Sequence, residues 1–188
     1  MPLLGFHQLE NAALAVTALE ALGSQGIEVP AQAMEAGFER VSWPCRMEVL
    51  SRSPFLVADG AHNVYSVQSL LKSLPKYLEY DRLIVVAGFS RDKDVADMAQ
   101  ALGEKADTVI ATASRHPRSM TPSEVAALFG AAAIEAPTPA DALRLALETA
   151  GEKDLVLATG SLFLTAEVRE SALGIEPETY PELAAPGS

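Results

Sequence analysis

The sequence predicts an α/β protein with a doubly wound, mostly parallel sheet, helices on both faces, an antiparallel edge strand and two preceding helices. The first observation is that strand candidates such as 82–88 and 154–159 are short, aliphatic and unalternating, which is typical of strands buried on both faces. The second is that helical segments separate the strands with connections of a few residues, which favours right-handed crossovers. The third is a pair of short strands so close in sequence that they predict a hairpin at the sheet edge.

Two helices precede any strand. Residues 8–22 place Leu9, Val16 and Leu19 at helical spacing, and Gly23 stops the helix. A second helix is predicted over 30–40, with a proline at its first position.

A linker then leads into the edge hairpin. Strands are predicted over 47–51 and 55–58, and a helix begins at the capping residue Asn63. Its apolar stripe consists of Val64, Val67, Leu71, Leu74 and Leu78. We expect Pro75 to kink this helix or to end it early.

Strands and helices alternate regularly in the remaining chain. The predicted strands are 82–88, 107–112, 132–136 and 154–159. The predicted helices are 92–102, 122–129, 138–150 and 162–171. Residues 172–188 contain three prolines and little periodicity, so they are predicted to form a tail.

Composition and charge exclude several classes of function. The chain has 188 residues, 49% of them hydrophobic, which predicts a folded globular protein. Its formal net charge of −11 argues against a broad surface for DNA or RNA. The apolar stretch 83–89 is far shorter than the roughly 20 residues that span a bilayer, and no secretory signal is readable. We therefore expect a cytoplasmic protein without nucleic-acid or membrane partners.

The sequence predicts neither a disulfide nor a metal site. A single cysteine, Cys45, excludes an intrachain disulfide and fits a reducing compartment. The three histidines are dispersed and form no pair at metal-ligand spacing. Cys45 lacks a nucleophile pattern around it and is interpreted as structural.

Polar chemistry is expected in the loops that follow the strands, because ligands of open parallel sheets bind beyond the carboxyl ends of the strands. These loops are 59–63, 90–94, 114–118 and 160–161. They bring an acid, two imidazoles, hydroxyls and several cations together on an acidic chain. Such local positive charge suits an anionic small ligand, for example a nucleotide phosphate or a carboxylate.

The DGAHN segment at 59–63 allows two interpretations. In one, Asp59 points into the crevice and accepts hydrogen bonds from ribose hydroxyls, while His62 contacts a phosphate or passes a proton. In the other, Asp59 and Asn63 cap the following helix and His62 is solvated. Loop chemistry alone leaves both open.

The remaining loops are more simply structural. Adjacent aspartates are expected to neutralise Arg91 and Lys93 at a solvated helix start. Arg115, His116 and Arg118 are predicted to lie in a solvated loop, with carboxylate binding as the alternative. Ser161 is expected to cap the last helix, although a helix amino terminus can also bind an anion.

The chain lacks its own phosphate cradle. It contains neither G-x-x-x-x-G-K-[ST] nor G-x-G-x-x-G, and it has no G-x-S-x-G elbow. Any nucleotide would therefore have to be held partly by something else.

Five ordered segments resemble a known family. The segments LLGFHQLENAALAVTALEAL, WPCRMEVL, DGAHN, VVAGFSRDKDV and LATGSLFL are similar, in order and spacing, to the carboxyl-terminal third of bacterial folylpolyglutamate synthases, which are often bifunctional with dihydrofolate synthase. These enzymes belong to the Mur ligase superfamily, and the resemblance covers residues 3–171. It implies the last helices of a central ATPase domain at 1–41, a Rossmann-like carboxyl-terminal domain at 42–171 and a tail at 172–188.

The resemblance also implies a reaction. The carboxylate of folate or dihydropteroate becomes an acyl phosphate at the expense of ATP, and the amine of L-glutamate attacks it with release of ADP and phosphate. ATP and Mg²⁺ are the implied cofactors, with the P-loop and the Mg²⁺ ligands expected in a missing amino-terminal ATPase domain. The isolated chain is therefore expected to be inactive.

Three nucleotide-binding residues follow from the resemblance. Asn11 would contact the adenine end of ATP, and Arg46 would reach the phosphates. Asp59 would contact the ribose or the adenine end.

Three further residues are implied near the chemistry. His62 is the implied catalytic residue, close to the reacting phosphate, and Ser161 is implied near the incoming glutamate. Lys93 is a weaker candidate for substrate binding.

Three positions depart from the family pattern. Cys45 stands where the family usually has glycine, which would stiffen the hinge before Arg46. Val64 replaces a usual proline and Phe163 a usual tyrosine.

Two other functions remain open. One is a different Mur-type ligase that acts on a cell-wall peptide, although DGAHN and TGSLF favour the folate branch. The other is a non-catalytic module that binds a nucleotide or glutamate. Leu3, Leu4 and Phe6 are candidates for an exposed patch through which the chain would self-associate.

Overall fold

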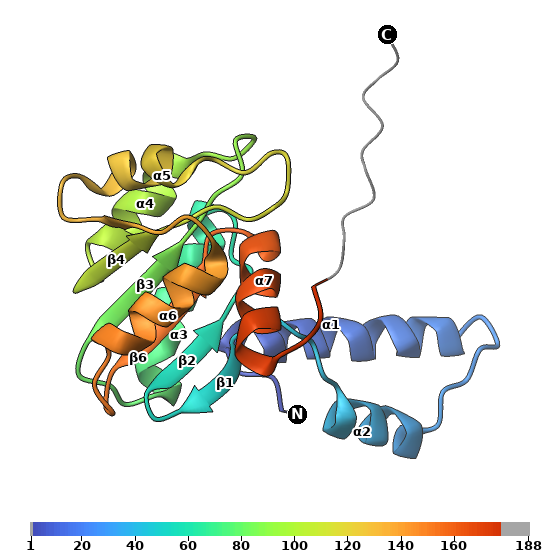
Figure 1. Cartoon of the computed structure of the whole chain (residues 1–188). Coiled ribbons are helices and arrows are strands. Elements are labelled where there is room, and N and C mark those ends of the chain that lie inside the picture. Colours follow the sequence, from blue (N-terminus) through green and yellow to red (C-terminus); the bar gives the residue numbers. More distant parts are fainter. Residues whose placement is uncertain (1, 178–188) are drawn as a thin grey trace, which may run out of the picture.

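A computed structural model, which describes residues 2–177, confirms the predicted α/β class (Figure 1). The strands are β1 (Glu48–Arg52), β2 (Phe55–Ala58), β3 (Leu83–Ala87), β4 (Thr108–Ala111), β5 (Ile134–Glu135) and β6 (Leu155–Thr159). The helices are α1 (Phe6–Gly23), α2 (Ala31–Arg40), α3 (Val64–Tyr77), α4 (Val95–Gly103), α5 (Pro122–Phe129), α6 (Pro139–Thr149) and α7 (Leu162–Leu173). The predicted elements are all present, with ends that differ by a few residues.

The six strands form one sheet in the order β1-β2-β6-β3-β4-β5. β1 pairs with β2 in antiparallel orientation at the edge, as the hairpin predicted, and the other neighbours pair in parallel. β6 comes last in sequence but enters the centre of the sheet, where Leu157 lies opposite both Val57 and Val85. The carboxyl ends of β2, β6 and β3 are therefore neighbours at one edge.

Helices cover both faces of the sheet. α3, α4 and α5 pack on one face, where their apolar side chains share a core with Val57, Val85 and Leu157. α6 and α7 pack on the other face, against Ile84 and Val156. Alternate residues of each central strand thus enter different cores. This arrangement explains why the strands show no polar alternation in the sequence.

The expectation that Pro75 ends its helix early is wrong. α3 continues to Tyr77 with Pro75 inside it. The proline lies two residues before the end of the helix, so only the last turn lacks an amide donor, and its fixed φ is compatible with helix. Leu74, which is fully buried, anchors this end of α3 in the core.

α1 and α2 form a separate pair that projects from the sheet domain (Figure 1). α2 has no buried residue, and the predicted apolar stripe of α1 is only partly covered, because Leu9 is 57% exposed. Of the three residues expected in an exposed patch, Phe6 is exposed, whereas Leu3 and Leu4 are half-buried. Within residues 2–177, no helix combines the length and the apolar composition needed to cross a membrane.

Candidate functional site

The linker between α2 and β1 holds Arg46 outward. Cys45 and Met47 have positive φ angles of 59° and 45°, and their side chains are only 3% and 2% exposed. Arg46 lies between them and is exposed. Among the residues that the structure describes, no carboxylate pairs with its guanidinium. The backbone therefore turns two buried side chains inward and one cation outward.

The carboxylate of Asp59 connects this linker to the loop after β2 by hydrogen bonds. One carboxylate oxygen accepts a hydrogen bond from the backbone amide of Met47 at 2.8 Å, and the other accepts one from Ala61 at 2.9 Å. The Asp59 residue is only 7% exposed. It neither caps α3 nor lies open in a crevice. The structure shows Asp59 as the tie between the linker and the loop after β2.

Asn63 and His62 follow the capping interpretation more closely. Asn63 accepts a hydrogen bond from the amide of Ser66 at 2.8 Å and caps α3. His62 is exposed, and its Nδ1 lies 2.8 Å from the carbonyl oxygen of Gly60. This contact is a hydrogen bond when Nδ1 carries the proton, which leaves Nε2 as an exposed acceptor.

The loop after β6 lies beside the loop after β2. The amide of Gly160 donates to the carbonyl of Ala61 at 3.1 Å. Gly160 has a φ of 104°, and a Cβ there would lie 2.7 Å from the carbonyl oxygen of Gly88, so this close approach requires glycine. Ser161 is 4% exposed and caps α7 by accepting a hydrogen bond from the amide of Phe163. The structure thus brings the loops of His62 and Ser161 together.

The cations of the loop after β3 are paired. Arg91 binds Glu124 with both terminal nitrogens, at 2.5 and 2.6 Å, rather than a neighbouring aspartate. Lys93 pairs with Asp92 at 3.3 Å, as predicted, and Arg118 also contacts Asp92. Lys93 lies on a different loop from Arg46 and His62, and it does not line the cavity that Arg46 lines.

The prediction of a solvated loop is confirmed for Arg115 and Arg118, which are exposed, and is wrong for His116, which is buried. The Arg115 amide donates to Glu167 at 2.8 Å, and its guanidinium contacts Glu170 at 2.7 Å. The ring of His116 is 9% exposed and stacks on Phe163, with ring centroids 3.9 Å apart. These contacts attach the loop to α7, which the local sequence does not reveal.

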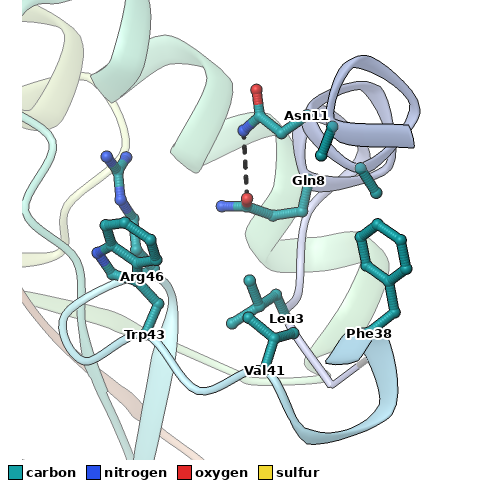
Figure 2. A pocket seen from close by; sticks show the side chains of 9 residues that line it. Leu3, Gln8, Asn11, Phe38, Val41, Trp43 and Arg46 are labelled. Atoms are coloured by element: carbon teal, nitrogen blue, oxygen red, sulfur yellow. Dashed lines mark hydrogen bonds between the residues drawn. The ribbon is translucent and has the colours of Figure 1, made fainter. Parts of the chain in front are cut away.

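Asn11 and Arg46 lie around one cavity of about 340 Å³ between α1, α2 and the linker (Figure 2). Its lining consists of Leu3, Gln8, Asn11, Ala12, Ala15, Phe38, Val41, Trp43 and Arg46. The Asn11 amide donates to the side-chain oxygen of Gln8 at 3.3 Å. Gln8, Phe38 and Trp43 were not among the residues predicted from the sequence. The available sequence signal for Trp43 was the single tryptophan of the chain next to a proline in the linker, and the structure shows this side chain 60% exposed.

No group of three or more metal-ligating side chains occurs within residues 2–177. These residues therefore provide no cage of side chains that would hold a Mg²⁺ ion by themselves.

Comparisons with known proteins agree with this architecture. The family described as "Mur ligase, glutamate ligase domain" matches residues 45–162. A curated relative from Halobacterium salinarum, described as a probable bifunctional folylpolyglutamate synthase/dihydropteroate synthase, is 37% identical over 90% of the chain. The solved Mycobacterium tuberculosis folylpolyglutamate synthase complexed with ADP and AMPPCP is 28% identical over 95% of the chain, with a TM-score of 0.82.

A third relative has a different described activity. The UDP-N-acetylmuramyl-tripeptide synthetase of Leifsonia xyli is 33% identical over 85% of the chain. The chain spans only 20% of the Halobacterium protein, 34% of the Leifsonia protein and 42% of the Mycobacterium structure. The family match at residues 45–162 lies within the sheet domain. The resemblance to folylpolyglutamate synthases that the five segments indicated is confirmed. The chain belongs to the Mur ligase family, and residues 45–162 carry the glutamate ligase domain of that family.

Proposed function

We propose that this chain is the carboxyl-terminal part of an ATP-dependent ligase that adds L-glutamate to folate or dihydropteroate through an acyl phosphate. The similarity to folylpolyglutamate synthases supports this assignment. In the proposal, residues 1–41 are the end of a central ATPase domain, 42–171 the carboxyl-terminal domain and 172–188 a tail, of which 178–188 lie outside the described residues. The working compartment of the enzyme is the cytoplasm, and the Mg²⁺ ligands belong to residues outside this chain.

The observation that carries the proposal is the placement of Arg46 and Asn11 around one cavity. Apolar walls such as Phe38 and Trp43 suit the faces of a purine, and the Asn11 amide offers both a donor and an acceptor to its polar edge. The guanidinium of Arg46, which has no ion pair within residues 2–177, suits the phosphates. The cavity therefore receives the adenine end of ATP, with Arg46 aimed along the phosphate chain.

His62 and Ser161 are proposed to act nearer to the transferred groups. When the amine of glutamate attacks the acyl phosphate, a C–N bond forms, the bond from the acyl carbon to the phosphate oxygen breaks, and the nitrogen loses a proton. The exposed Nε2 of His62 is available to accept that proton. Ser161, at the amino end of α7, lies beside the peptide donors that suit the glutamate carboxylate. Lys93 is the weaker candidate, because Asp92 already neutralises it.

Nucleotide binding to the chain itself tests the cavity assignment. Trp43 is the only tryptophan and lines the cavity, so its fluorescence reports occupancy directly. We expect ADP to change this fluorescence, and Arg46→Ala to weaken ADP binding roughly tenfold through loss of a charged hydrogen bond. Arg144→Ala, which removes an exposed ion pair on α6, is the control and should leave ADP binding unchanged. Equal ADP affinity in wild type and Arg46→Ala would refute the cavity assignment.

A second candidate function is ligation of an amino acid to a UDP-linked muramyl peptide, which the Leifsonia relative favours. ADP release by the full-length gene product, measured with glutamate and a folate, dihydropteroate or a UDP-linked muramyl peptide as acceptor, separates the two. We expect turnover with the folate, the dihydropteroate or both, and none with the muramyl peptide. The isolated chain should release no ADP, because its sequence contains no P-loop motif. A full-length product that binds ADP and turns over none of the three acceptors would instead indicate a binding module.

We also propose that the exposed apolar side chains of α1 face a further domain or a second copy of the chain. Phe6, Leu9 and Leu14 are 63%, 57% and 69% exposed. Such side chains on one helix favour association. Light scattering of the isolated chain should show self-association that Leu14→Glu reduces, and a monomer at all concentrations would exclude the second copy.

A further inference from the structure

The Arg46 side chain is directed by hydrogen bonds of the backbone groups of Cys45 and Met47, and not by an ion pair of its guanidinium. The amide of Cys45 donates to Oε2 of Glu48 at 2.9 Å, and the carbonyl of Cys45 accepts from Gly60 at 2.9 Å. The amide of Met47 donates to Asp59 at 2.8 Å. The peptide groups on both sides of Arg46 are thus tied to the sheet domain, while the guanidinium itself has no ion pair among the described residues.

Glu48 is in turn held by Arg169 of α7. The Nε of Arg169 lies 2.9 Å from Oε1 and 3.0 Å from Oε2 of Glu48. The side chains are 27% and 24% exposed, so the pair is largely shielded from water. The carboxylate of Glu48 therefore accepts hydrogen bonds both from the linker and from α7, which lies more than a hundred residues later in the sequence.

These ties oppose an unfavourable backbone. Both Cys45 and Met47 are non-glycine residues with positive φ, at 59° and 45°. Such conformations persist only where surrounding contacts determine them. If the Glu48 carboxylate loses its orientation, the bond to the Cys45 amide weakens and the linker can relax toward negative φ. Arg46 would then point elsewhere.

We propose that Glu48 and Arg169 are positioning residues that aim Arg46 at the phosphates of the bound nucleotide; this inference rests on the proposed function. Arg169 does not line the cavity, and Glu48 neutralises its charge, so it acts through Arg46 rather than on the nucleotide. Loosening the pair lowers the fraction of molecules in which Arg46 is correctly directed. The apparent phosphate affinity falls by that same fraction.

The test compares the affinity of the chain for adenosine, which has no phosphate, with its affinity for ADP, which has two. Trp43 fluorescence gives dissociation constants of the chain for adenosine and ADP, and their ratio is the gain from the phosphates. We expect Arg46→Ala to reduce this gain roughly tenfold and Arg169→Met to reduce it roughly three- to tenfold. Adenosine affinity should change little in either variant. Arg169→Lys keeps the charge and should recover part of the gain, and Arg144→Met, in an exposed pair on α6, should match wild type.

A double-variant cycle separates positioning from a merely structural role. If Arg169 acts through Arg46, then Arg169→Met should have no further effect on the gain in the Arg46→Ala background. Glu48→Gln provides a second variant should Arg169→Met fail to fold, and it should reduce the gain in the same way.

The outcomes distinguish this inference from the proposed function. A wild-type chain with no gain from phosphates would refute the proposed cavity function and the positioning role together. A wild-type gain that Arg169→Met and Glu48→Gln both retain would refute the positioning role alone. An equal loss of adenosine and ADP affinity in these variants, or additivity with Arg46→Ala, would also overturn it, because both indicate general damage to the cavity.

Discussion

Replacing Cys45 tests the origin of the linker conformation, because this non-glycine residue has a left-handed backbone. Cys45 has a φ of 59° and is 3% exposed. In this left-handed region a side chain costs about 1–2 kcal/mol relative to glycine. Glycine in turn loses roughly 0.5–1 kcal/mol in chain entropy, and the buried Cβ contributes about 0.8 kcal/mol.

These magnitudes predict an unusual order of stability. At an ordinary buried position, glycine is less stable than alanine by more than about 1 kcal/mol. At position 45, relief of strain offsets that loss, so Cys45→Gly and Cys45→Ala should have free energies of unfolding within about 0.8 kcal/mol of each other. Both should be less stable than wild type, because the thiol is buried and shares a hydrogen bond with Thr165.

Urea unfolding followed by circular dichroism gives the three free energies. Ala99→Gly in α4 is the control, since Ala99 is 2% exposed within a regular helix and should lose more than about 1 kcal/mol. If Cys45→Gly falls below Cys45→Ala by as much as the control loses, the backbone at 45 is not strained. The reasoning about the linker would then be refuted.

Three further predictions concern the loops and the thiol. Gly160→Ala should lower the free energy of unfolding by at least ~2 kcal/mol, because a Cβ would meet a backbone oxygen at 2.7 Å, whereas Gly37→Ala, with open space around it, should not destabilise. The bidentate contact with Arg91 lowers the pKa of Glu124 to about 2. The ionised Glu124 therefore contributes its full stabilisation of the fold above pH 4.5, and this contribution is lost as the pH falls through 2. Carboxyl chemical shifts should follow that titration, and Arg91→Met should raise the pKa toward 4.5; an unchanged titration would exclude the pair as the cause. Burial raises the pKa of the Cys45 thiol, so a thiol reagent should label the native chain far more slowly than the urea-unfolded chain, and equal rates would contradict its burial.

The strands were predictable because burial on both faces leaves a local signature. Each central strand must present apolar side chains to two cores, so 83–87 and 155–159 are almost wholly aliphatic. The order of the strands has no such signature. β6 lies between β2 and β3 because Leu157 packs beside both Val57 and Val85, and nothing in the periodicity of a strand specifies its neighbours.

The sequence predicted some of the residues that belong to the candidate site, but not the contacts that these residues make in the folded chain. Asn11 and Arg46 follow from the resemblance, and the structure places both around one cavity. The contacts of Asp59 were not predictable, because its partner Met47 becomes accessible only when the linker folds onto the loop after β2. The ring of His116 stacks on Phe163 of α7, which is distant in sequence, so the local pattern of polar residues around His116 did not reveal its burial.

The distribution of paired charges changes how phosphate recognition should be understood in this chain. The sequence suggested that cations gathered at the sheet edge would attract an anionic ligand, but Arg91, Lys93 and Arg115 each have an acidic partner in the structure. Paired charges produce little field beyond their own contact, and the net charge of −11 opposes a long-range attraction. In the proposed function, phosphate recognition therefore depends on the direction of one cation rather than on accumulated charge. A single guanidinium, Arg46, held outward between two buried residues, meets that requirement, and it explains why so many hydrogen bonds are devoted to the peptide groups beside it.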